Sequence, residues 1–313
     1  MDTDTHLDEL VAPLRDDVVS GASLLGRTAA DVIRRAAVRL QAGSLDELEV
    51  GLGEVCHRLL DAQPAMAPLV CLVRDVMAAV GSAPSLEAGR HAAASAADDF
   101  RNGFEARVRA VGEAATGILP AGGMIATISA SATLHAIFSA EAQPRGITVL
   151  CFESRRMNEG RHFATTLAAA GVDVMYAVDA AAPSLIPECD QVMVGADSIG
   201  DQGVVNKIGS AMIAQIARSA GIPVYVVADE TKVLPRGFPQ NVADDRPTSE
   251  VWSAPEGVRV WNRYFEVTPF EYVTGVVTER GVLDLPALEA TRGAMELPAG
   301  LRAWAAGRAH ASD

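Results

Sequence analysis

The sequence predicts an α/β fold: an N-terminal helical domain, residues 1–118, followed by a domain built on a mainly parallel sheet, residues 119–313. Two patterns carry this prediction. In the first third, apolar residues recur at spacings of three and four, which is typical of amphipathic helices. After the Leu-Pro-Ala-Gly-Gly segment at 119–123, short apolar runs alternate with helical segments. Such alternation indicates parallel strands covered on both faces.

The periodicity also gives the elements in order. In the helical domain, helices are expected at residues 24–40, 45–60, 70–80 and 87–117, with a break at 64–68. In the second domain, strands are expected at residues 124–128, 147–152, 174–178, 192–195, 224–228 and 273–278. Helices are expected there at residues 132–140, 160–170 and 204–220. Residues 236–256 are rich in proline and aspartate and predict a long loop, and the tail after residue 301 is expected to fray.

Charge and hydropathy exclude several functional classes. The net charge is −14 and no basic patch stands out, so no nucleic-acid partner is expected. No stretch approaches the roughly 18 to 20 apolar residues that span a bilayer, so no membrane segment is expected. The acidic N-terminal residues lack the apolar core of a signal peptide, which predicts a cytoplasmic protein.

Cysteine and histidine spacing gives no sign of a metal site. The sequence contains four cysteines: Cys56, Cys71, Cys151 and Cys189. None forms a Cys-x-x-Cys pair, and the six histidines are scattered, so neither structural zinc nor a disulfide framework is expected. The sequence therefore predicts no metal and no cofactor.

The run at residues 194–210 combines an apolar strand end, an acid and a glycine-bearing turn. Asp197 follows the strand, where it could serve as an acid or base or bind sugar hydroxyls. A helix expected to open near Val204 would present free N–H groups to a phosphate, with Asn206 and Lys207 on its first turns. The alternative is that Asp197 only caps the turn and Lys207 is solvated. The patterns of the P-loop and of the dinucleotide fingerprint are both absent.

Two other strand ends carry polar side chains. Ligands of open parallel sheets bind beyond the carboxyl ends of the strands. Ser129 and Ser131 follow the first expected strand, where the alternative interpretation is helix capping. Arg155 and Arg156 follow the second, and arginine suits bidentate phosphate contact. The alternative there is an exposed charged loop.

These turns together resemble one family, which contains methylthioribose-1-phosphate isomerase, ribose-1,5-bisphosphate isomerase, and the alpha, beta and delta subunits of translation initiation factor 2B. The resemblance covers most of the chain. It is carried by Gly-Ala-Asp-Ser at 195–198, Gly-Val-Val-Asn-Lys-Ile-Gly at 203–209, Glu-Ser-Arg at 153–155 with Gly160, Phe-Glu-Val-Thr-Pro at 265–269, Val-Thr-Glu-Arg-Gly at 277–281 and Gly-Ala-Ser at 21–23.

The resemblance implies a fold, a ligand and an assembly. The fold is a helical domain followed by a Rossmann-like domain, and members assemble as homodimers or higher oligomers through the C-terminal domain. The implied ligand is a small phosphorylated sugar or a nucleotide. The implied binding residues are Gly21, Ala22, Ser23, Arg155, Gly160, Asn206 and Lys207.

The isomerases of this family convert an aldose 1-phosphate to a ketose 1-phosphate, and the resemblance implies a cysteine and an aspartate as the working pair. Asp197 matches the aspartate, whereas Ser129 stands in the place of the cysteine. A thiol has a pKa of about 8.5, but a serine hydroxyl needs an adjacent base to act. Ser20 and Gln63 also stand where the isomerases carry arginines. The chain thus resembles a divergent member that lacks the catalytic cysteine.

Three hypotheses follow for the function. In the first, the chain binds a sugar phosphate or nucleotide without the usual thiol-dependent isomerisation. In the second, it isomerises an altered substrate, with Asp197 as acid and base and Ser129 as a hydroxyl donor. In the third, it is a regulatory subunit of an assembly similar to translation initiation factor 2B.

Overall fold

The structure is a computed structural model that describes residues 3–17, 20–240, 242 and 246–309. The chain divides into two compact units. Unit 1 comprises Met1–Ala106, Thr231–Gln240 and Thr291–Asp313, and unit 2 comprises Arg107–Glu230 and Asn241–Ala290. Two late segments of the chain therefore return to the unit formed by its first third.

Unit 1 is helical. Its elements are α1 (Thr3–Arg15), α2 (Ala22–Arg39), α3 (Leu45–Ala62), α4 (Ala67–Gly81), α5 (Leu86–Asn102), the first turn of α6 (Phe104–Ala115) and α12 (Ala299–Ala309). The helices expected at residues 24–40, 45–60 and 70–80 are confirmed. The single helix expected at 87–117 is wrong, because the chain forms two helices there, which part at Gly103.

Helix boundaries in unit 1 follow from capping residues. Ser44 and Ser85 begin α3 and α5, and each hydroxyl accepts a hydrogen bond from the N–H three residues on. These bonds satisfy donors that the first helical turn leaves open. Pro68 stands in the first turn of α4, where its missing N–H is tolerated.

Residues 302–309 are helical, so the fraying expected after residue 301 is wrong for this described part of the chain. Residues 299–309 form α12, whose Leu301 is fully buried. A methyl group at Gly300 would lie 2.8 Å from the terminal carbon of Met77, so α12 packs closely on α4. Trp304 stacks on His57 of α3 at 6.1 Å between ring centroids. The apolar surface that α12 buries stabilises this helix, although its alanine-rich sequence has only a weak helical periodicity.

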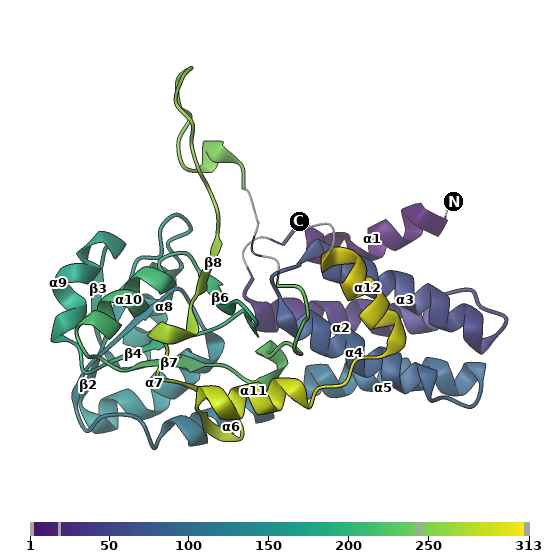
Figure 1. Ribbon diagram of the computed structural model, residues 1–313, viewed down its shortest axis with the longest axis horizontal. Coiled ribbons are helices and arrows are strands. Elements are labelled where there is room, and N and C mark those ends of the chain that lie inside the picture. Colours follow the sequence, from purple (N-terminus) through teal and green to yellow (C-terminus); the bar gives the residue numbers. More distant parts are fainter. Residues whose placement is uncertain (1–2, 18–19, 241, 243–245, 310–313) are drawn as a thin grey trace. The chain divides into compact units, whose positions relative to one another are not determined.

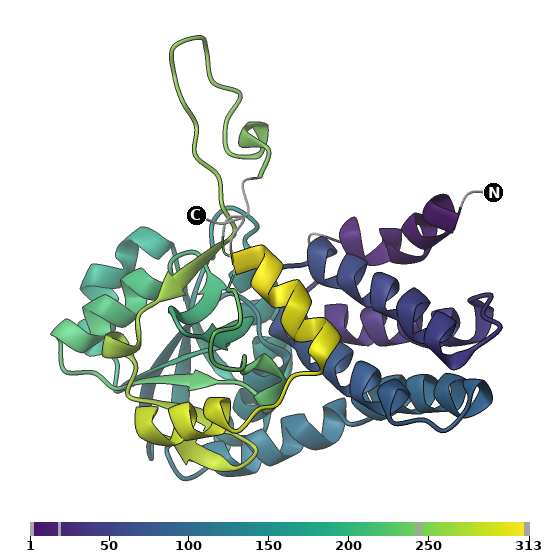
Figure 2. The same ribbon diagram turned by 45° about the vertical axis from the view of Figure 1, so that its right-hand side comes forward.

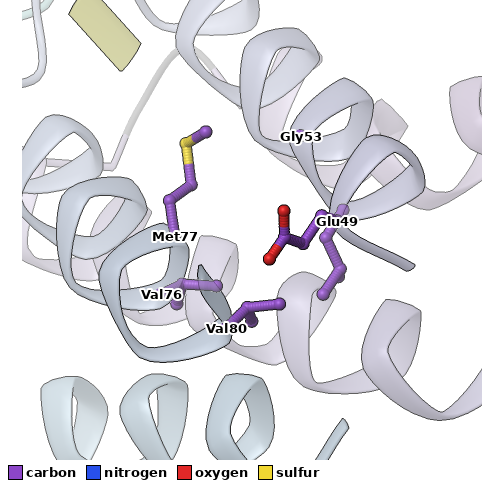
Figure 3. A pocket seen from close by; sticks show the side chains of 6 residues that line it. Glu49, Gly53, Val76, Met77 and Val80 are labelled. Atoms are coloured by element: carbon purple, nitrogen blue, oxygen red, sulfur yellow. The ribbon is translucent and has the colours of Figure 1, made fainter. Parts of the chain in front are cut away.

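A small cavity of about 60 Å³ lies between α3 and α4. It is lined by Glu49, Leu52, Gly53, Val76, Met77 and Val80. Figure 3 shows the Glu49 carboxylate and the Met77 thioether facing this hollow from opposite helices. Small-molecule sites usually enclose about 300 to 1,000 Å³, so this cavity is too small for a sugar phosphate.

Unit 2 is built on a seven-stranded sheet in the order β10-β9-β7-β4-β1-β2-β3. Its strands are β1 (Gly123–Ile128), β2 (Ile147–Phe152), β3 (Asp173–Ala177), β4 (Gln191–Val194), β7 (Val224–Val227), β9 (Gly275–Thr278) and β10 (Gly281–Leu283). All pair in parallel except β10, which runs antiparallel to β9. The six expected strands and the mainly parallel Rossmann-like sheet are confirmed.

The helices of unit 2 cover this sheet (Figure 1). They are α7 (Ala132–Arg145), α8 (Glu159–Ala169), α9 (Ala182–Leu185), α10 (Ser210–Ser219), the remainder of α6 and most of α11 (Leu285–Gly293). Short 3₁₀ turns occur at Asp179–Ala181, Ile186–Glu188, Glu230–Lys232, Thr248–Glu250 and Phe270–Tyr272. The core between sheet and helices includes Ile125, Phe138, Val149 and Leu167.

A second, three-stranded antiparallel sheet corrects the helix expected at residues 204–220. It consists of β5 (Ser198–Gly200), β6 (Gly203–Lys207) and β8 (Phe265–Thr268). Helix α10 begins only at Ser210. Gly203 and Gly209 have φ of +131° and +100°, which a helix cannot accommodate, and they bound the strand on both sides. The buried β-branched Val204 and Val205 favour a strand between them.

Residues 246–264 form a projection that we call the arm. Figures 1 and 2 both show it extending away from the sheets of unit 2. Its regular structure within the described residues is the 3₁₀ turn Thr248–Glu250, in agreement with the long loop expected at 236–256. Among the described helices of both units, none is both long enough and apolar enough to cross a membrane.

Candidate functional site

The three suggestive turns lie at one edge of the seven-stranded sheet. Strand β1 lies between β4 and β2. From β1 the chain continues to β2 and β3 on one side, and it then crosses back to form β4 on the other side. This is the topological switch point at which open α/β sheets bind ligands. Ser129 directly follows β1, and Asp197 comes three residues after β4. A methyl group at Gly195 would lie 3.3 Å from the Ser131 side chain, which confirms that the two turns meet.

The two serines after β1 have different roles. The Ser131 hydroxyl accepts a hydrogen bond of 3.3 Å from the N–H of Leu134 and caps α7. Ser129 does not cap the helix, and its backbone has φ of +67°. The capping alternative therefore explains Ser131 and leaves Ser129 without a structural reason.

Left-handed backbone gathers at this edge. Within the described chain, the non-glycine residues with positive φ are Ser129, Ser154 and Asn158. All three lie in the turns after β1 and β2. The left-handed conformation costs an L-residue about 1 to 3 kcal/mol, and such residues cluster at active sites and ligand clamps.

Asp179 supports the turn after β2. Its two carboxylate oxygens accept hydrogen bonds from the backbone N–H of Ser154, at 2.9 Å, and of Arg155, at 2.7 Å. Ser154 is fully buried, and its hydroxyl has no hydrogen-bond partner among the described atoms. A charged residue from the loop after β3 thus holds the strained turn in place.

The two arginines of this turn differ in whether their side chains already have partners in the described chain. Arg156 donates one 3.0 Å hydrogen bond to the Tyr264 hydroxyl and pairs with the Glu250 carboxylate at 3.0 Å. These contacts, with the Tyr264 bond foremost, raise the pKa of Arg156. The side chain of Arg155 is exposed and makes no hydrogen bond or ion pair within the residues described. Of the two, Arg155 is the one free to bind an anion.

Gly160 has a steric role at the start of α8. A methyl group there would overlap the carbonyl oxygen of Phe152 and lie 2.9 Å from its carbonyl carbon. Glycine therefore lets the first turn of α8 approach the end of β2. The predicted contact of Gly160 with a ligand stays a prediction.

Asp197 lies where the two sheets of unit 2 meet. Its N–H donates a 2.8 Å hydrogen bond to the Val205 carbonyl, and β5 begins at the next residue. The residue is half-buried. Its position beside the switch point suits acid–base chemistry or the binding of sugar hydroxyls.

Lys207 ends β6, so its placement on the first turns of a helix is wrong. Its ammonium group pairs with the Glu159 carboxylate at 2.7 Å, and the two side chains are only 11% and 19% exposed. The ammonium also lies 5.1 Å from the ring centroid of Tyr264 and 5.0 Å from that of Phe265. The alternative of a solvated lysine is therefore also wrong, and its charge is already matched by a carboxylate.

Asn206 also lies on β6 rather than on a helix. It is buried, and its amide donates a 3.0 Å hydrogen bond to the Ser210 hydroxyl. That hydroxyl donates in turn to the Lys207 carbonyl at 2.6 Å. Asn206 thus shapes the connection between β6 and α10.

The N-terminus of α10 holds a carboxylate of the chain itself. One Glu266 oxygen accepts hydrogen bonds of 2.8 Å from the N–H groups of Gly209 and Ala211. Burial raises the pKa of Glu266, while these two bonds act in the opposite direction. The phosphate position expected at a helix start near Val204 is therefore wrong, because Val204 is in a strand and Glu266 occupies the true helix start.

The predicted residues Gly21, Ala22 and Ser23 belong to unit 1. Gly21 precedes α2 in an extended conformation, and its carbonyl accepts bonds from the N–H groups of Leu24 and Leu25. The first turn of α2 contains no acidic residue. Its N–H groups are therefore of the kind that binds anions.

Burial disfavours the thiolate form of three of the four cysteines. Cys151 lies on β2, and burial raises its pKa to about 12. Burial likewise raises the pKa of Cys56 to about 12 and that of Cys189 to about 11. The Cys71 sulfur contacts the Arg74 guanidinium at 3.3 Å on α4. No cysteine occupies the turn after β1, where Ser129 stands.

Sequence reasoning missed an acidic cluster after β7 and β9. Asp229 is buried and lies 3.7 Å from the Arg107 guanidinium. The Glu230 N–H donates to Glu279 at 2.9 Å, and burial raises the pKa of Glu279. The sequence does indicate this cluster, because charged residues directly follow the apolar runs at 224–228 and 273–278. Across the residues with described positions, no cluster of three metal-ligating side chains occurs.

Comparison with known proteins decides the family. The model of the initiation factor 2 subunit family matches residues 18–285. The chain belongs to this family. Ribose 1,5-bisphosphate isomerase from Thermococcus kodakarensis is 29% identical over 289 residues, covering 88% of this chain and 90% of that protein. Methylthioribose-1-phosphate isomerase from Geobacillus thermodenitrificans is 31% identical over 302 residues, covering 87% of this chain and 84% of that protein.

A solved member of the initiation factor 2 subunit family supports the fold. The crystal structure of the translation initiation factor eIF-2B from Pyrococcus horikoshii aligns with a TM-score of 0.76 at 27% identity. The alignment covers 90% of this chain and 98% of that structure. The resemblance seen in the motifs therefore extends over both units of this family member.

Proposed function

We propose that this family member binds a small phosphorylated sugar, or a nucleotide, at the edge of the sheet where β4, β1 and β2 end. One observation carries the proposal: the left-handed residues Ser129, Ser154 and Asn158 all flank the switch point. Backbone strain of this kind persists only where the surrounding structure holds it, as at ligand clamps.

The side chains at the switch point suit this ligand class. Arg155 offers a guanidinium without a partner in the described chain, which fits a phosphate. Asp197 and Ser129 offer a carboxylate and a hydroxyl at the switch point, which fit sugar hydroxyls. Lys207 contributes less, because Glu159 already balances its charge.

Loss of the catalytic cysteine is part of this proposal. Ser129 would stand in place of the thiol, and the buried Cys151 cannot replace it, because burial raises its pKa to about 12. The chain would then bind its ligand without thiol-dependent isomerisation. It would work as a homodimer or higher oligomer assembled through the C-terminal domain.

Isothermal titration calorimetry with pentose 1-phosphates, ribose 1,5-bisphosphate and nucleoside monophosphates tests the binding proposal. We expect heat of binding with at least one compound, and a rise in the melting temperature with the same compound. If neither measurement responds to any member of the panel, the proposal fails.

A second candidate is aldose–ketose isomerisation, which the relatives favour. Proteins named as ribose 1,5-bisphosphate and methylthioribose-1-phosphate isomerases match about nine-tenths of the chain at 29% identity. In this reaction hydrogen moves between C1 and C2 of the sugar, and Asp197 would give and accept a proton. Assays of ketose formation by NMR would detect it.

Two variants separate the candidates. In an isomerase, Asp197→Asn should lower turnover at least about 100-fold, since positioned acid–base catalysis is typically worth 10² to 10⁴. Ser129→Cys should raise turnover if the missing thiol is what limits the reaction. An Asp197→Asn variant with unchanged turnover would contradict the isomerase role of this residue.

A further inference from the structure

The arm contacts the turn after β2 through a polar network centred on Glu250. One oxygen of the Glu250 carboxylate accepts hydrogen bonds of 2.7 Å from the Tyr264 hydroxyl and 3.0 Å from the Asn262 amide. It also pairs with the Arg156 guanidinium at 3.0 Å. The same guanidinium donates a 3.0 Å hydrogen bond to the Tyr264 hydroxyl, which is 108 residues away in the sequence. The network therefore joins a residue of the turn to three residues of the arm.

The base of the arm is itself fixed to unit 2. The Arg246 N–H donates a 3.1 Å hydrogen bond to the Asn262 carbonyl, which ties the two ends of the arm together. The Tyr264 carbonyl accepts a 2.9 Å bond from the N–H of Ile208, in the connection between β6 and α10. The Tyr264 bond, more than any other contact, lowers the pKa of Glu250 and keeps this carboxylate charged. Hydrogen bonds to a charged group are the strong ones, so the network is well held.

The Tyr264 ring lies among three cations. Its centroid is 4.8 Å from the Arg246 guanidinium, 5.1 Å from the Lys207 ammonium and 5.9 Å from the Arg156 guanidinium. A cation within about 6 Å of an aromatic centroid is attracted by the ring. This one buried side chain of the arm therefore contacts both the end of β6 and the turn after β2.

Arg155 stands between two fixed neighbours in that turn. On one side, the N–H groups of Ser154 and Arg155 donate to the Asp179 carboxylate at 2.9 Å and 2.7 Å. On the other side, the Arg156 carbonyl accepts a 3.1 Å bond from the Asn158 amide, and the arm holds the Arg156 guanidinium. The backbone on both sides of Arg155 is thus fixed, while its exposed guanidinium has no partner within the described residues.

We propose that Glu250 and Tyr264 of the arm are positioning residues for the ligand site: they hold Arg156 and so fix the turn that directs Arg155 toward the phosphate of the ligand. This inference rests on the proposed function and adds the arm to the site that binds the sugar phosphate. Ordering a long side chain during binding lowers affinity, and a turn that is fixed beforehand reduces this loss. The arm thus contributes to affinity without contacting the ligand.

The charge of Glu250 alone predicts the opposite effect on binding. A carboxylate beside an anion site repels a phosphate, and it also neutralises Arg156. If Glu250 acted only through its charge, its removal would strengthen phosphate binding. If it acts by holding the turn, its removal weakens phosphate binding. The direction of the change therefore separates the two roles.

Titration calorimetry with the panel of pentose 1-phosphates, ribose 1,5-bisphosphate and nucleoside monophosphates tests the proposal. We expect Glu250→Ala to bind about 5-fold more weakly and Tyr264→Phe about 3-fold more weakly than the unaltered protein. Tyr264→Phe keeps the ring among its cations and removes only the hydroxyl, so this variant should fold. Tyr272→Phe is the matched control, because it removes a hydroxyl at the 3₁₀ turn Phe270–Tyr272, and its affinity should not change.

Double variants distinguish positioning from a general weakening of the fold. In an Arg155→Ala background, neither Glu250→Ala nor Tyr264→Phe should lower the affinity further, because both act through Arg155. A variant that merely destabilised the protein would lower the affinity in both backgrounds. Equal losses with and without Arg155 would therefore overturn the inference, as would tighter binding by Glu250→Ala.

Hydrogen exchange of the ligand-free protein gives an independent readout. Amides of residues 153–159 should exchange faster in both arm variants, whereas those of β1 should not change. Unchanged exchange at residues 153–159 would overturn the inference and leave the proposed function standing. If the unaltered protein binds no member of the panel, the proposed function fails, and the role of the arm in binding fails with it.

Discussion

Two regions of unit 2 were expected to bind the same anion, and they differ in what already occupies them. At the junction of β6 and α10, Lys207 is paired with Glu159, and the helix N-terminus is bound by Glu266. At the turns after β1 and β2, Ser129 is held in a left-handed conformation, and Arg155 has no side-chain partner in the described chain. In the first region, carboxylates already bind both the lysine and the helix N-terminus, whereas in the second region the Arg155 guanidinium has no such partner in the described chain.

This difference shows what a motif can and cannot indicate. A lysine beside a helix start satisfies the chemical requirements of a phosphate site. Whether it is available depends on carboxylates that come from distant parts of the chain, here α8 and β8. We therefore infer that the β6–α10 junction supports the site, while the turns after β1 and β2 contact the ligand.

The largest expected effect comes from Gly160, on which the geometry of the second region depends. Gly160→Ala should lower the free energy of unfolding by about 3 kcal/mol or more, because its methyl group would overlap the Phe152 carbonyl. Urea unfolding measures the change. The matched control is Gly112→Ala in α6, where the nearest atom would be 3.8 Å away and helix propensity favours alanine. Equal stabilities for the two variants would contradict the close approach.

The next largest effect should come from the paired region. Lys207→Met should cost about 2 kcal/mol of stability, because it leaves the largely buried Glu159 carboxylate without its partner. The second Glu159 oxygen already lacks a partner among the described atoms. Adding Glu159→Gln should recover part of the loss, which a double-mutant cycle by urea unfolding would measure. Strictly additive effects would mean that the ion pair does not matter.

Much of the fold was predictable because its signals are local. Alternating apolar runs and helices predicted six of the seven strands of the large sheet, since these runs are continuous and, apart from the more exposed β3, largely buried. The small sheet escaped detection because β5 has only three residues and β8 pairs with β6 across a long stretch of sequence. The site was predictable only as a set of strand ends. The ion pair of Lys207 and the capping role of Glu266 depend on long-range contacts, which residue spacing does not indicate.

The next effect concerns ligand binding by Arg155. Arg155→Ala should weaken the binding of a pentose phosphate about 10-fold, or about 1.4 kcal/mol, with little change in stability, because its side chain is exposed. Arg145→Ala is the matched control, since that arginine pairs with Glu141 at the far end of α7. Titration calorimetry measures both affinities. If Arg155→Ala binds as tightly as the control, the anion contact lies elsewhere.

A smaller effect distinguishes the two serines after β1. Ser131→Ala should cost about 1 kcal/mol of stability through loss of the α7 cap. Ser129→Gly should cost less or stabilise the fold slightly, since glycine tolerates φ of +67°. Ligand affinity should fall only for Ser129→Gly. Unchanged affinity in that variant would make Ser129 a relic rather than a ligand contact.

The smallest effect concerns Glu266 at the start of α10 and depends on pH. Burial raises the pKa of this carboxyl above its value in the unfolded chain, so the folded state favours the protonated form. The associated stabilisation is present below the unfolded pKa and is lost as the pH rises through the folded pKa. Glu266→Gln keeps an oxygen that can accept both N–H groups but does not titrate. Its stability relative to the unaltered chain should therefore improve between pH 4 and pH 7, by less than about 1 kcal/mol.

Urea unfolding at the two pH values measures this change, with Glu113→Gln on α6 as the control for loss of one exposed carboxyl in the same unit. The direction of the effect matters for the comparison of the two regions. The opposite outcome is that Glu266→Gln loses stability relative to the unaltered chain as the pH rises. In that case the charged carboxylate would be a net stabilising cap, and burial would not be the main influence on the pKa of Glu266. The α10 terminus would then be closed to a phosphate even more firmly, since the phosphate would have to displace a favourable charge. Of the two regions, the turns after β1 and β2 would remain the proposed anion site, because Arg155 there has no side-chain partner in the described chain.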